Sequence, residues 1–213
     1  MTVLLLIRHG HTDTAGKRLT GWSKGVHLND RGRREAKTLV ERLEGIPVAA
    51  IYASPLERAR ETAAPLARAR RLAVRTRRGL IETGYGEWTG RSIAQLRRSK
   101  LWTTLMRSPS AMRFPGGESL VDVQARTVAE LDRIARDHPH GVVAVVSHAD
   151  VVALALAHHA GMHLDHYQRL TVDPASISVV VVGDHASRLV KVNDTGGLAS
   201  LVPSRRSKAK LRG

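Results

Sequence analysis

Apolar residues are concentrated in three short runs, and each run ends in polar residues; the runs are 2–7, 48–53 and 142–147. Stretches with a helical spacing of apolar positions lie between and after them, at about 30–44, 55–69, 118–137 and 149–161. Alternating strands and helices are typical of β-α units around a parallel sheet, and continuously apolar strands indicate a sheet covered on both faces. The pattern therefore predicts an α/β fold: a three-layer α/β/α sandwich with a mostly parallel, doubly wound sheet.

Two late segments, ISVVVVGD and SRLVKVND, are joined by a short connection and predict a hairpin. We therefore expect an antiparallel edge strand. Residues 83–117 are rich in Gly, Ser, Arg and Pro, which indicates an insertion or lid, with one helix near 91–106. The length of 213 residues suits one domain, expected over 1–203. Residues 204–213 are expected to form a disordered basic tail.

The helix after the second apolar run has a recognisable start. Ser54-Pro55-Leu56-Glu57 matches a capping box with proline at the first helical position. This start places Arg58 in the first turn, where free N–H groups and the helix dipole attract anions.

Three of the predicted strands are followed by candidate chemistry: Arg8-His9, Ser54 to Arg58, and Ser147-His148. If these strands are parallel, their carboxyl ends open onto one edge of the sheet, where ligands bind in open α/β folds. Two arginines and two histidines then share a pocket that has no neutralising carboxylate. Guanidinium groups match the oxygens of phosphate, and a neutral imidazole among cations can attack phosphorus. A bordering carboxylic acid is needed to protonate the leaving oxygen.

The formal net charge of +15 allows two interpretations. Five basic residues lie in the tail, which permits binding to nucleic acid or an acidic protein. The arginine-rich stretch 67–79, however, has no interleaved aromatic residues, and a basic field also steers a small anionic substrate. Neither partner is required by the charge, because solvated charge typical of an arginine-rich composition explains it at least as well. From the pocket of arginines and histidines we expect a small phosphorylated substrate, and nucleic acid is not expected as a partner.

The location of the protein is predicted from what the chain lacks. There is no cysteine, which excludes disulfides and thiolate metal sites and suits a reducing compartment. The N-terminus MTVLLLIRHG has no basic n-region, and its apolar run is too short for a signal peptide or a membrane span. The sequence predicts a cytoplasmic protein without a membrane partner, and it allows a homodimer without requiring one.

The segment RHGHT (8–12) resembles the RHG-x-T motif of the histidine phosphatase superfamily, which contains the cofactor-dependent phosphoglycerate mutases. Further segments in the same order are similar to other parts of that family; they are 18–36, SPLERARETA (54–63), LIETGYGEWTG (80–90), FPGGES (114–119) and VVSHAD (145–150). The resemblance spans residues 3 to about 195. Several motifs in one order are far more specific than a lone RHG.

The resemblance implies a role for each site residue. His9 is the nucleophile and becomes phosphohistidine, while Arg8, Arg58 and His148 hold the phosphoryl oxygens. Glu82 protonates the leaving oxygen and then deprotonates the attacking water. No metal and no cofactor are required.

Some positions are open or depart from the family pattern. Glu87 lies in the same loop as Glu82, and periodicity alone does not choose between them. Ala15 replaces an asparagine that often helps to bind phosphate, and Ala149 replaces the glycine that commonly follows the second histidine. A charged residue, Asp150, comes next. These departures affect the expected substrate, not the core reaction.

A phosphomonoesterase is the preferred activity, because FPGGES is the phosphatase-like form and the insertion is short. A phosphomutase is the alternative, since RLTGW and ETGYG resemble mutase segments, with Thr20, Gly21 and Tyr85 as candidate substrate contacts. His11 and Thr12 are further candidates because they lie close to His9. A protein phosphohistidine phosphatase is a less favoured activity. A metal site formed by His9 and His11 is also less favoured, because no carboxylate or cysteine accompanies the two histidines.

Overall fold

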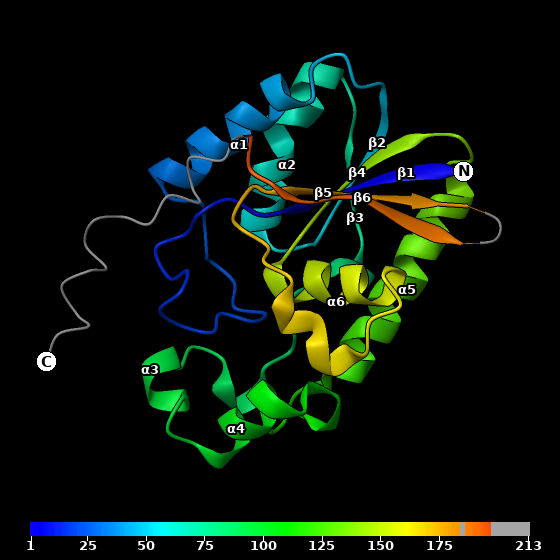
Figure 1. The fold of residues 1–213 in the computed structure, drawn as a ribbon. Coiled ribbons are helices and arrows are strands. Elements are labelled where there is room, and N and C mark those ends of the chain that lie inside the picture. Colours follow the sequence, from blue (N-terminus) through cyan, green and yellow to red (C-terminus); the bar gives the residue numbers. More distant parts are fainter. Residues whose placement is uncertain (184–185, 197–213) are drawn as a thin grey trace, which may run out of the picture.

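The computed structural model describes residues 1–183 and 186–196, and six strands in this part of the chain form one sheet (Figure 1). The strand order is β3-β2-β4-β1-β5-β6. The strands are β1 (Thr2–Arg8), β2 (Val48–Ala53), β3 (Val74–Thr76), β4 (Val142–Ser147), β5 (Ile177–Val182) and β6 (Ser187–Asp194). The first four run parallel, β5 runs antiparallel to β1, and β6 pairs with β5 as the edge strand. The predicted α/β fold and its terminal hairpin are confirmed.

Helices cover both faces of the sheet (Figure 1). α1 (Asp30–Arg42) and α2 (Glu57–Arg70) lie on one face, and α5 (Leu120–Asp137) and α6 (Ala149–His159) lie on the other. Because successive side chains of a strand point to opposite faces, β1 contributes to two separate cores. Leu5 and Ile7 pack in the core under α1 and α2, whereas Leu4 and Leu6 pack in the core under α5 and α6.

Local signals in the sequence fix where these helices begin. The side chain of Asn29 accepts a hydrogen bond from the backbone N–H of Gly32 at 2.9 Å at the start of α1. Ser119 and Asp122 form a reciprocal capping box at the start of α5. Such caps each contribute about 1 kcal/mol. α6 is buried along Val151 to Ala157, which explains why its sequence is apolar all round.

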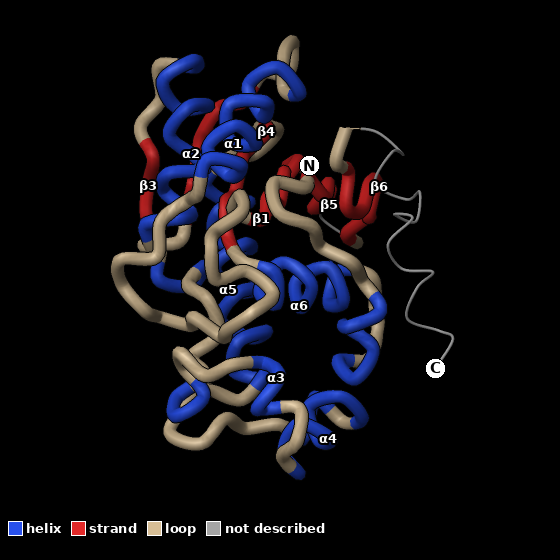
Figure 2. The backbone as a smooth tube through the Cα atoms, turned by 90° about the vertical axis from the view of Figure 1, so that its left-hand side faces the viewer, coloured by secondary structure: helices blue, strands red, loops and turns tan. Residues whose placement is uncertain are grey.

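The insertion lies beside α5 and α6, away from α1 and α2 (Figure 2). It contains two short α-helices, α3 (Ile93–Leu96) and α4 (Lys100–Arg107), so the prediction of one helix near 91–106 is wrong. The break arises because Ser99 caps a new helix, with its hydroxyl accepting from the N–H of Trp102 at 3.2 Å. Short 3₁₀ turns complete the connections: η1 (Arg78–Leu80), η2 (Gly86–Trp88), η3 (Pro109–Ala111) and η4 (Leu164–Arg169).

The strand β3 was not anticipated, because it has only three residues and none of them is buried. The predicted basic tail, 204–213, lies outside the described residues. No helix in residues 1–183 and 186–196 is both long and apolar enough to span a membrane.

Candidate active site

The parallel register brings the ends of β1, β2 and β4 side by side. Arg8 at the end of β1 is in register with Ser147 of β4, and Ala53 at the end of β2 is in register with Val146. The backbone N–H of His9 donates to the carbonyl of Ser147 at 2.9 Å, so the ladder continues one residue beyond β1. His9, Ser54 and His148 therefore follow three neighbouring strands at one edge of the sheet.

The imidazole of His9 is oriented by its neighbour. Its Nδ1 atom lies 2.8 Å from the carbonyl oxygen of Gly10. A carbonyl can only accept a hydrogen bond, so Nδ1 carries the proton and the lone pair is on Nε2. The side chain is buried, and burial together with the positive charge of Arg58 lowers the pKa of His9 to about 3. His9 is therefore neutral near pH 7 and has the tautomer of a nucleophile.

Two arginines present buried donors at this edge. Arg58 is 1% exposed, and its Nη2 donates to the carbonyl of Gly21 at 2.9 Å. Arg8 donates from Nη1 to the carbonyl of Val172 at 2.6 Å. Among the described residues, Nε and Nη1 of Arg58 and Nε of Arg8 have no acceptor. Buried donors without acceptors cost free energy, and an oxyanion with several oxygens would satisfy them.

His148 completes the group. Its ring centroid lies 5.2 Å from that of His9, with an angle of 64° between the planes. Its Nε2 atom is 2.7 Å from the hydroxyl of Ser54. Burial lowers the pKa of His148 well below its ordinary value, and the charge of Arg58 acts in the same direction. A second neutral imidazole therefore borders His9.

The contact with His148 explains one wrong prediction. Ser54 is not a helix cap: α2 begins at Glu57, and its N-cap residue Leu56 has an extended backbone and no side-chain cap. The hydroxyl of Ser54 is turned to His148 instead, and the N–H of Leu56 approaches it only to 3.4 Å. Arg58 still lies in the first turn of α2, as the sequence indicates.

The structure distinguishes the two glutamates of the acid-bearing loop. Glu82 is 7% exposed, whereas Glu87 is exposed on η2. Oε1 of Glu82 accepts from the N–H of Thr83 at 2.9 Å, and Oε2 lies 3.7 Å from Nδ1 of His148. Burial raises the pKa of Glu82 to about 7, and the neighbouring Asp150 adds to the rise. Glu82 thus stands beside His148 as a carboxylic acid that can release and recover a proton near neutral pH.

The expectation of a pocket without carboxylates is wrong. Glu82 and Asp150 both interact electrostatically with Arg8. Burial raises the pKa of Asp150, which favours its neutral form and so limits how far it neutralises the arginines. The sequence pattern gave no indication of this, because α6 brings Asp150 to the site only through tertiary packing.

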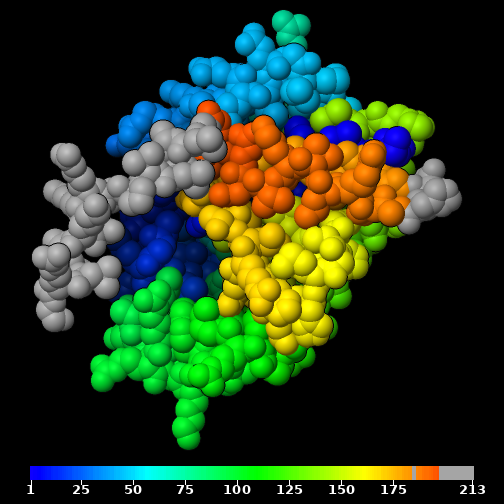
Figure 3. All heavy atoms as spheres, in the orientation of Figure 1, coloured from blue at the N-terminus to red at the C-terminus, as the bar shows by residue number. Residues whose placement is uncertain are grey.

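The candidate substrate contacts differ in burial and in the groups that they contact. Thr12 is buried, Thr20 is half-buried, and the carbonyl of Gly21 binds Arg58. Tyr85 is buried, and its ring packs edge-on against Phe114 at 5.0 Å between centroids. In the space-filling view, a hollow opens between the dark-blue N-terminal segment, the green insertion and the yellow segment that follows α6 (Figure 3).

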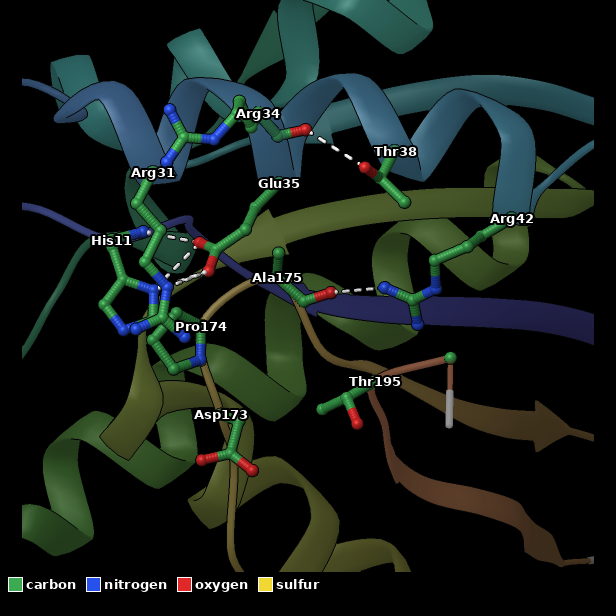
Figure 4. A pocket seen from close by; sticks show the side chains of 11 residues that line it. His11, Arg31, Arg34, Glu35, Thr38, Arg42, Asp173, Pro174, Ala175 and Thr195 are labelled. Atoms are coloured by element: carbon green, nitrogen blue, oxygen red, sulfur yellow. Dashed lines mark hydrogen bonds and ion pairs between the residues drawn. The ribbon is translucent and has the colours of Figure 1, made fainter. Parts of the chain in front are cut away.

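His11 faces a second hollow. Its Nδ1 atom lies 2.7 Å from Oε1 of Glu35 on α1, and the backbone N–H of His11 donates to Oε2 of the same carboxylate at 3.0 Å (Figure 4). This hollow has a volume of about 650 Å³ and is also lined by Arg34 and Asp173. His9 and His11 are thus engaged by different partners, Gly10 and Glu35.

One group that supports the site was not anticipated from the sequence. Arg126 on α5 forms a paired salt bridge with Glu118, with Nε–Oε1 and Nη2–Oε2 distances of 2.8 and 3.0 Å. The same guanidinium binds the backbone of the loop that carries Glu82. Glu118 belongs to the FPGGES segment, but an arginine that binds backbone carbonyls leaves no periodic signal in a sequence.

Comparison with known proteins agrees with this geometry. Residues 4–195 match the model of the histidine phosphatase superfamily (branch 1). The chain is 29% identical over 203 residues to phosphoserine phosphatase 1 of Hydrogenobacter thermophilus, covering 92% of this chain and 93% of that protein. It is 37% identical over 205 residues to the bifunctional protein Rv2228c of Mycobacterium tuberculosis, covering 92% of this chain but 55% of that protein. The chain therefore spans about half the length of that relative.

A solved structure shows the same architecture. Bacillus stearothermophilus YhfR superimposes with a TM-score of 0.85 at 28% sequence identity, covering 91% of this chain and 98% of the other. Strand order, paired histidines, buried arginines and family match lead to one conclusion. The chain belongs to branch 1 of the histidine phosphatase superfamily and is a phosphatase.

Proposed function

We propose that the protein is a phosphomonoesterase that hydrolyses a small phosphorylated metabolite through a phosphohistidine intermediate on His9. The observation that carries this proposal is the hydrogen bond from Nδ1 of His9 to the carbonyl of Gly10 at 2.8 Å, close to Arg58, whose Nε and Nη1 have no acceptor among the described residues. It places a nucleophilic nitrogen next to the charges that would hold a phosphoryl group.

The first step is transfer of the phosphoryl group to the protein. The lone pair on Nε2 of His9 forms a bond to phosphorus as the bond to the substrate oxygen breaks. Arg8, Arg58 and His148 bind the non-bridging oxygens, where charge accumulates in the transition state. Glu82 gives its proton to the departing oxygen, which leaves as an alcohol.

The second step returns the site to its starting state. Glu82, now a carboxylate, takes a proton from water, and the water oxygen attacks phosphorus as the bond to Nε2 of His9 breaks. Inorganic phosphate is released, and Glu82 again holds a proton. The guanidinium groups and the neutral imidazoles supply the charge stabilisation, so the proposed sequence of steps uses no metal ion.

The substrate class is supported by the arginines that border His9 and by the phosphoserine phosphatase among the relatives. The phosphomutase alternative shares the first step and differs in the acceptor, which would be a second hydroxyl in place of water. A cytoplasmic location is part of the proposal and is consistent with the absence of cysteine.

The test is a phosphate-release screen over a panel of phosphomonoesters, with His9→Ala as the control. In parallel, the protein is incubated with a ³²P-phosphomonoester, and the label that stays on the protein is measured after acid and after alkali treatment. Phosphohistidine survives alkali but not acid. We expect release by the wild-type protein, alkali-stable label, and loss of both in His9→Ala. Release that persists in His9→Ala would overturn the mechanism.

A second assay separates the two activities. The same preparation is tested for conversion of 3-phosphoglycerate to 2-phosphoglycerate in the presence of bisphosphoglycerate. Isomerisation faster than release would establish the phosphomutase. A protein that ends at residue 203 should keep its phosphate release, and any nucleic-acid binding that this truncation abolishes would be a property of the tail.

A further inference from the structure

The loop that carries Glu82 is bound at its backbone by one side chain from another element. Arg126 on α5 donates from Nη1 to the carbonyls of Gly79 and Ile81, at 2.9 and 2.8 Å. It donates from Nη2 to the carbonyl of Glu82 itself at 3.0 Å. Three carbonyls within four residues of chain therefore converge on one guanidinium.

A carboxylate fixes this guanidinium from the other side. Glu118 accepts from Nε of Arg126 at 2.8 Å and from Nη2 at 3.0 Å. Its Oε2 atom also accepts from the N–H of Gly84 at 2.7 Å, and its own N–H donates to the carbonyl of Gly84 at 2.8 Å. Glu118 and Arg126 are both about four-fifths buried, with 19% and 21% of the side chains exposed. The pair thus holds the loop on both sides of Glu82.

The surrounding glycines allow this close approach. A Cβ atom on Gly79 would lie 2.6 Å from Cβ of Glu130, and one on Gly117 would lie 2.2 Å from the carbonyl oxygen of Gly84. Neither could be accommodated without moving the loop. The Nε1 atom of Trp22 adds another hydrogen bond to the carbonyl of Glu82, at 2.5 Å.

We propose that Arg126, oriented by Glu118, is the positioning residue for Glu82: it holds the acid at the leaving oxygen of the substrate and does not itself touch the substrate. This inference rests on the proposed function, because it assumes that Glu82 protonates the leaving group. Bidentate geometry matters here, since only a planar fork can bind several carbonyls and a carboxylate together.

A change of Arg126 should slow the hydrolysis of some phosphate esters more than that of others. An alkyl phosphate has a poor leaving group and needs a proton from the acid, whereas an aryl phosphate such as p-nitrophenyl phosphate releases a stable phenolate and needs little help. A misplaced Glu82 therefore slows the first substrate much more than the second. A general loss of structure would slow both to the same extent.

The experiment measures kcat/KM for an alkyl phosphate and for p-nitrophenyl phosphate in wild type, Arg126→Met and Arg126→Lys. Arg133→Met is the matched control, because Arg133 lies on the same helix, is 62% exposed and forms an ion pair with Glu130 at 3.6 Å. For Arg126→Met we expect a fall of about 10²-fold with the alkyl ester and a few-fold at most with the aryl ester. Arg126→Lys should fall between wild type and Arg126→Met, and Arg133→Met should match wild type.

A double-mutant cycle supplies the second measurement. If Arg126 acts through Glu82, Arg126→Met should cause little further loss in a Glu82→Gln background, because the group to be positioned has gone. Multiplicative losses in the double variant would overturn the proposal. Equal losses with both esters, or no loss with either, would overturn it as well.

Two controls keep the result interpretable. Should Arg126→Met fail to fold, Glu118→Gln carries the same comparison, because it weakens the support of the guanidinium and leaves the guanidinium in place. Failure of the proposed function has a different signature: wild type would then hydrolyse neither ester in a His9-dependent manner, and the positioning role would fall with it.

Discussion

The phenol of Tyr85 donates a hydrogen bond to Oδ2 of Asp150 at 2.7 Å, which ties the acid-bearing loop to the first turn of α6. Asp150 in turn raises the pKa of Glu82, next in importance to burial. Two carboxyl groups, Glu82 and Asp150, therefore share one basic site. The pKa of Glu82 is therefore raised by burial and by Asp150, and the charges of Arg58 and Arg8 oppose this rise.

The first prediction concerns the pH dependence of the reaction. Glu82 must hold a proton to protonate the leaving oxygen, and its pKa lies at about 7. We expect kcat/KM for an alkyl phosphate to fall as pH rises through about 7, while the pKa of His9, at about 3, keeps the nucleophile neutral over the same range. Glu82→Gln should remove this descending limb. If the descending limb persists in Glu82→Gln, it arises from the ionisation of another group.

A second prediction follows from the charge of Asp150. Replacement by Asn removes a negative neighbour that disfavours ionisation of Glu82, so the pKa of Glu82 should fall. The descending limb of the pH profile should then move to lower pH in Asp150→Asn. Glu44→Gln, which changes an exposed carboxylate in the turn after α1, is the control and should leave the limb in place. A shift to higher pH in Asp150→Asn would contradict this account.

The third prediction is that ionisation of Glu82 lowers the stability of the folded protein at alkaline pH. Its pKa is raised in the folded state, so between its unfolded value of about 4.5 and about 7 the unfolded chain releases a proton that the folded chain retains. Stability contributed by this group is full below the unfolded value and is lost as pH rises toward 7. Glu82→Gln should therefore be more stable than wild type at pH 8, by about 1–3 kcal/mol.

Chemical denaturation at pH 4 and pH 8 checks this prediction. The difference in the free energy of unfolding between Glu82→Gln and wild type should be small at the lower pH and favour the variant at the higher pH. An unchanged difference at the two pH values would show that Glu82 ionises in the folded state as it does in the unfolded chain.

A fourth prediction concerns phosphate binding by Arg58. Nε and Nη1 of its buried guanidinium have no acceptor in the described part of the chain, and a lysine cannot reproduce this pair of donors. Arg58→Lys should lower kcat/KM about 10²- to 10³-fold. It should also abolish the rise in melting temperature that inorganic phosphate gives the wild-type protein. Arg60→Lys, an exposed neighbour on the same helix, should behave as wild type in both measurements.

The fifth prediction tests the close packing of the acid-bearing loop. Gly86 has a φ of +52°, and a Cβ atom there would lie 2.1 Å from the carbonyl oxygen of Pro115. Gly86→Ala should cost about 3 kcal/mol or more, because strain in the left-handed region adds to a clash with backbone. Gly90 has a φ of +80° and no atom of the described residues within 4 Å of the added Cβ, so Gly90→Ala should cost only about 1 kcal/mol. Urea denaturation gives the free energy of unfolding of both variants, and the difference between them separates the cost of the clash from the cost of backbone strain.

Much of the fold could be predicted from local patterns. The apolar runs predict β1, β2 and β4 because these strands are buried on both faces, and the helical spacing predicts α1, α5 and α6 because each has a long amphipathic or buried stretch. The strand β3 has neither property, and it forms because the end of β2 offers it a partner. The convergence of Arg8, His9 and His148 followed from the parallel topology alone.

Other features depend on contacts that a pattern does not contain. Ser54 has the sequence context of a helix cap, but His148, 94 residues later, takes its hydroxyl. Asp150 reads as an ordinary residue of a helix start until packing brings it to Tyr85 and Arg8. The hydrogen bonds of Arg126 go to backbone carbonyls more than forty residues away, which any residue type could supply.

The central position of β1 also bears on how the protein is made. Its neighbours in the sheet are β4 and β5, so Val3 pairs with Val142 and Val181. During synthesis the LLLI segment therefore emerges long before either partner exists, and the sheet cannot close until β5 has left the ribosome. Pairing across such separations makes folding slow, and it leaves an apolar strand open to chaperones in the meantime. Because the site residues follow β1, β2 and β4, recovery of activity during refolding reports the pairing of these three strands.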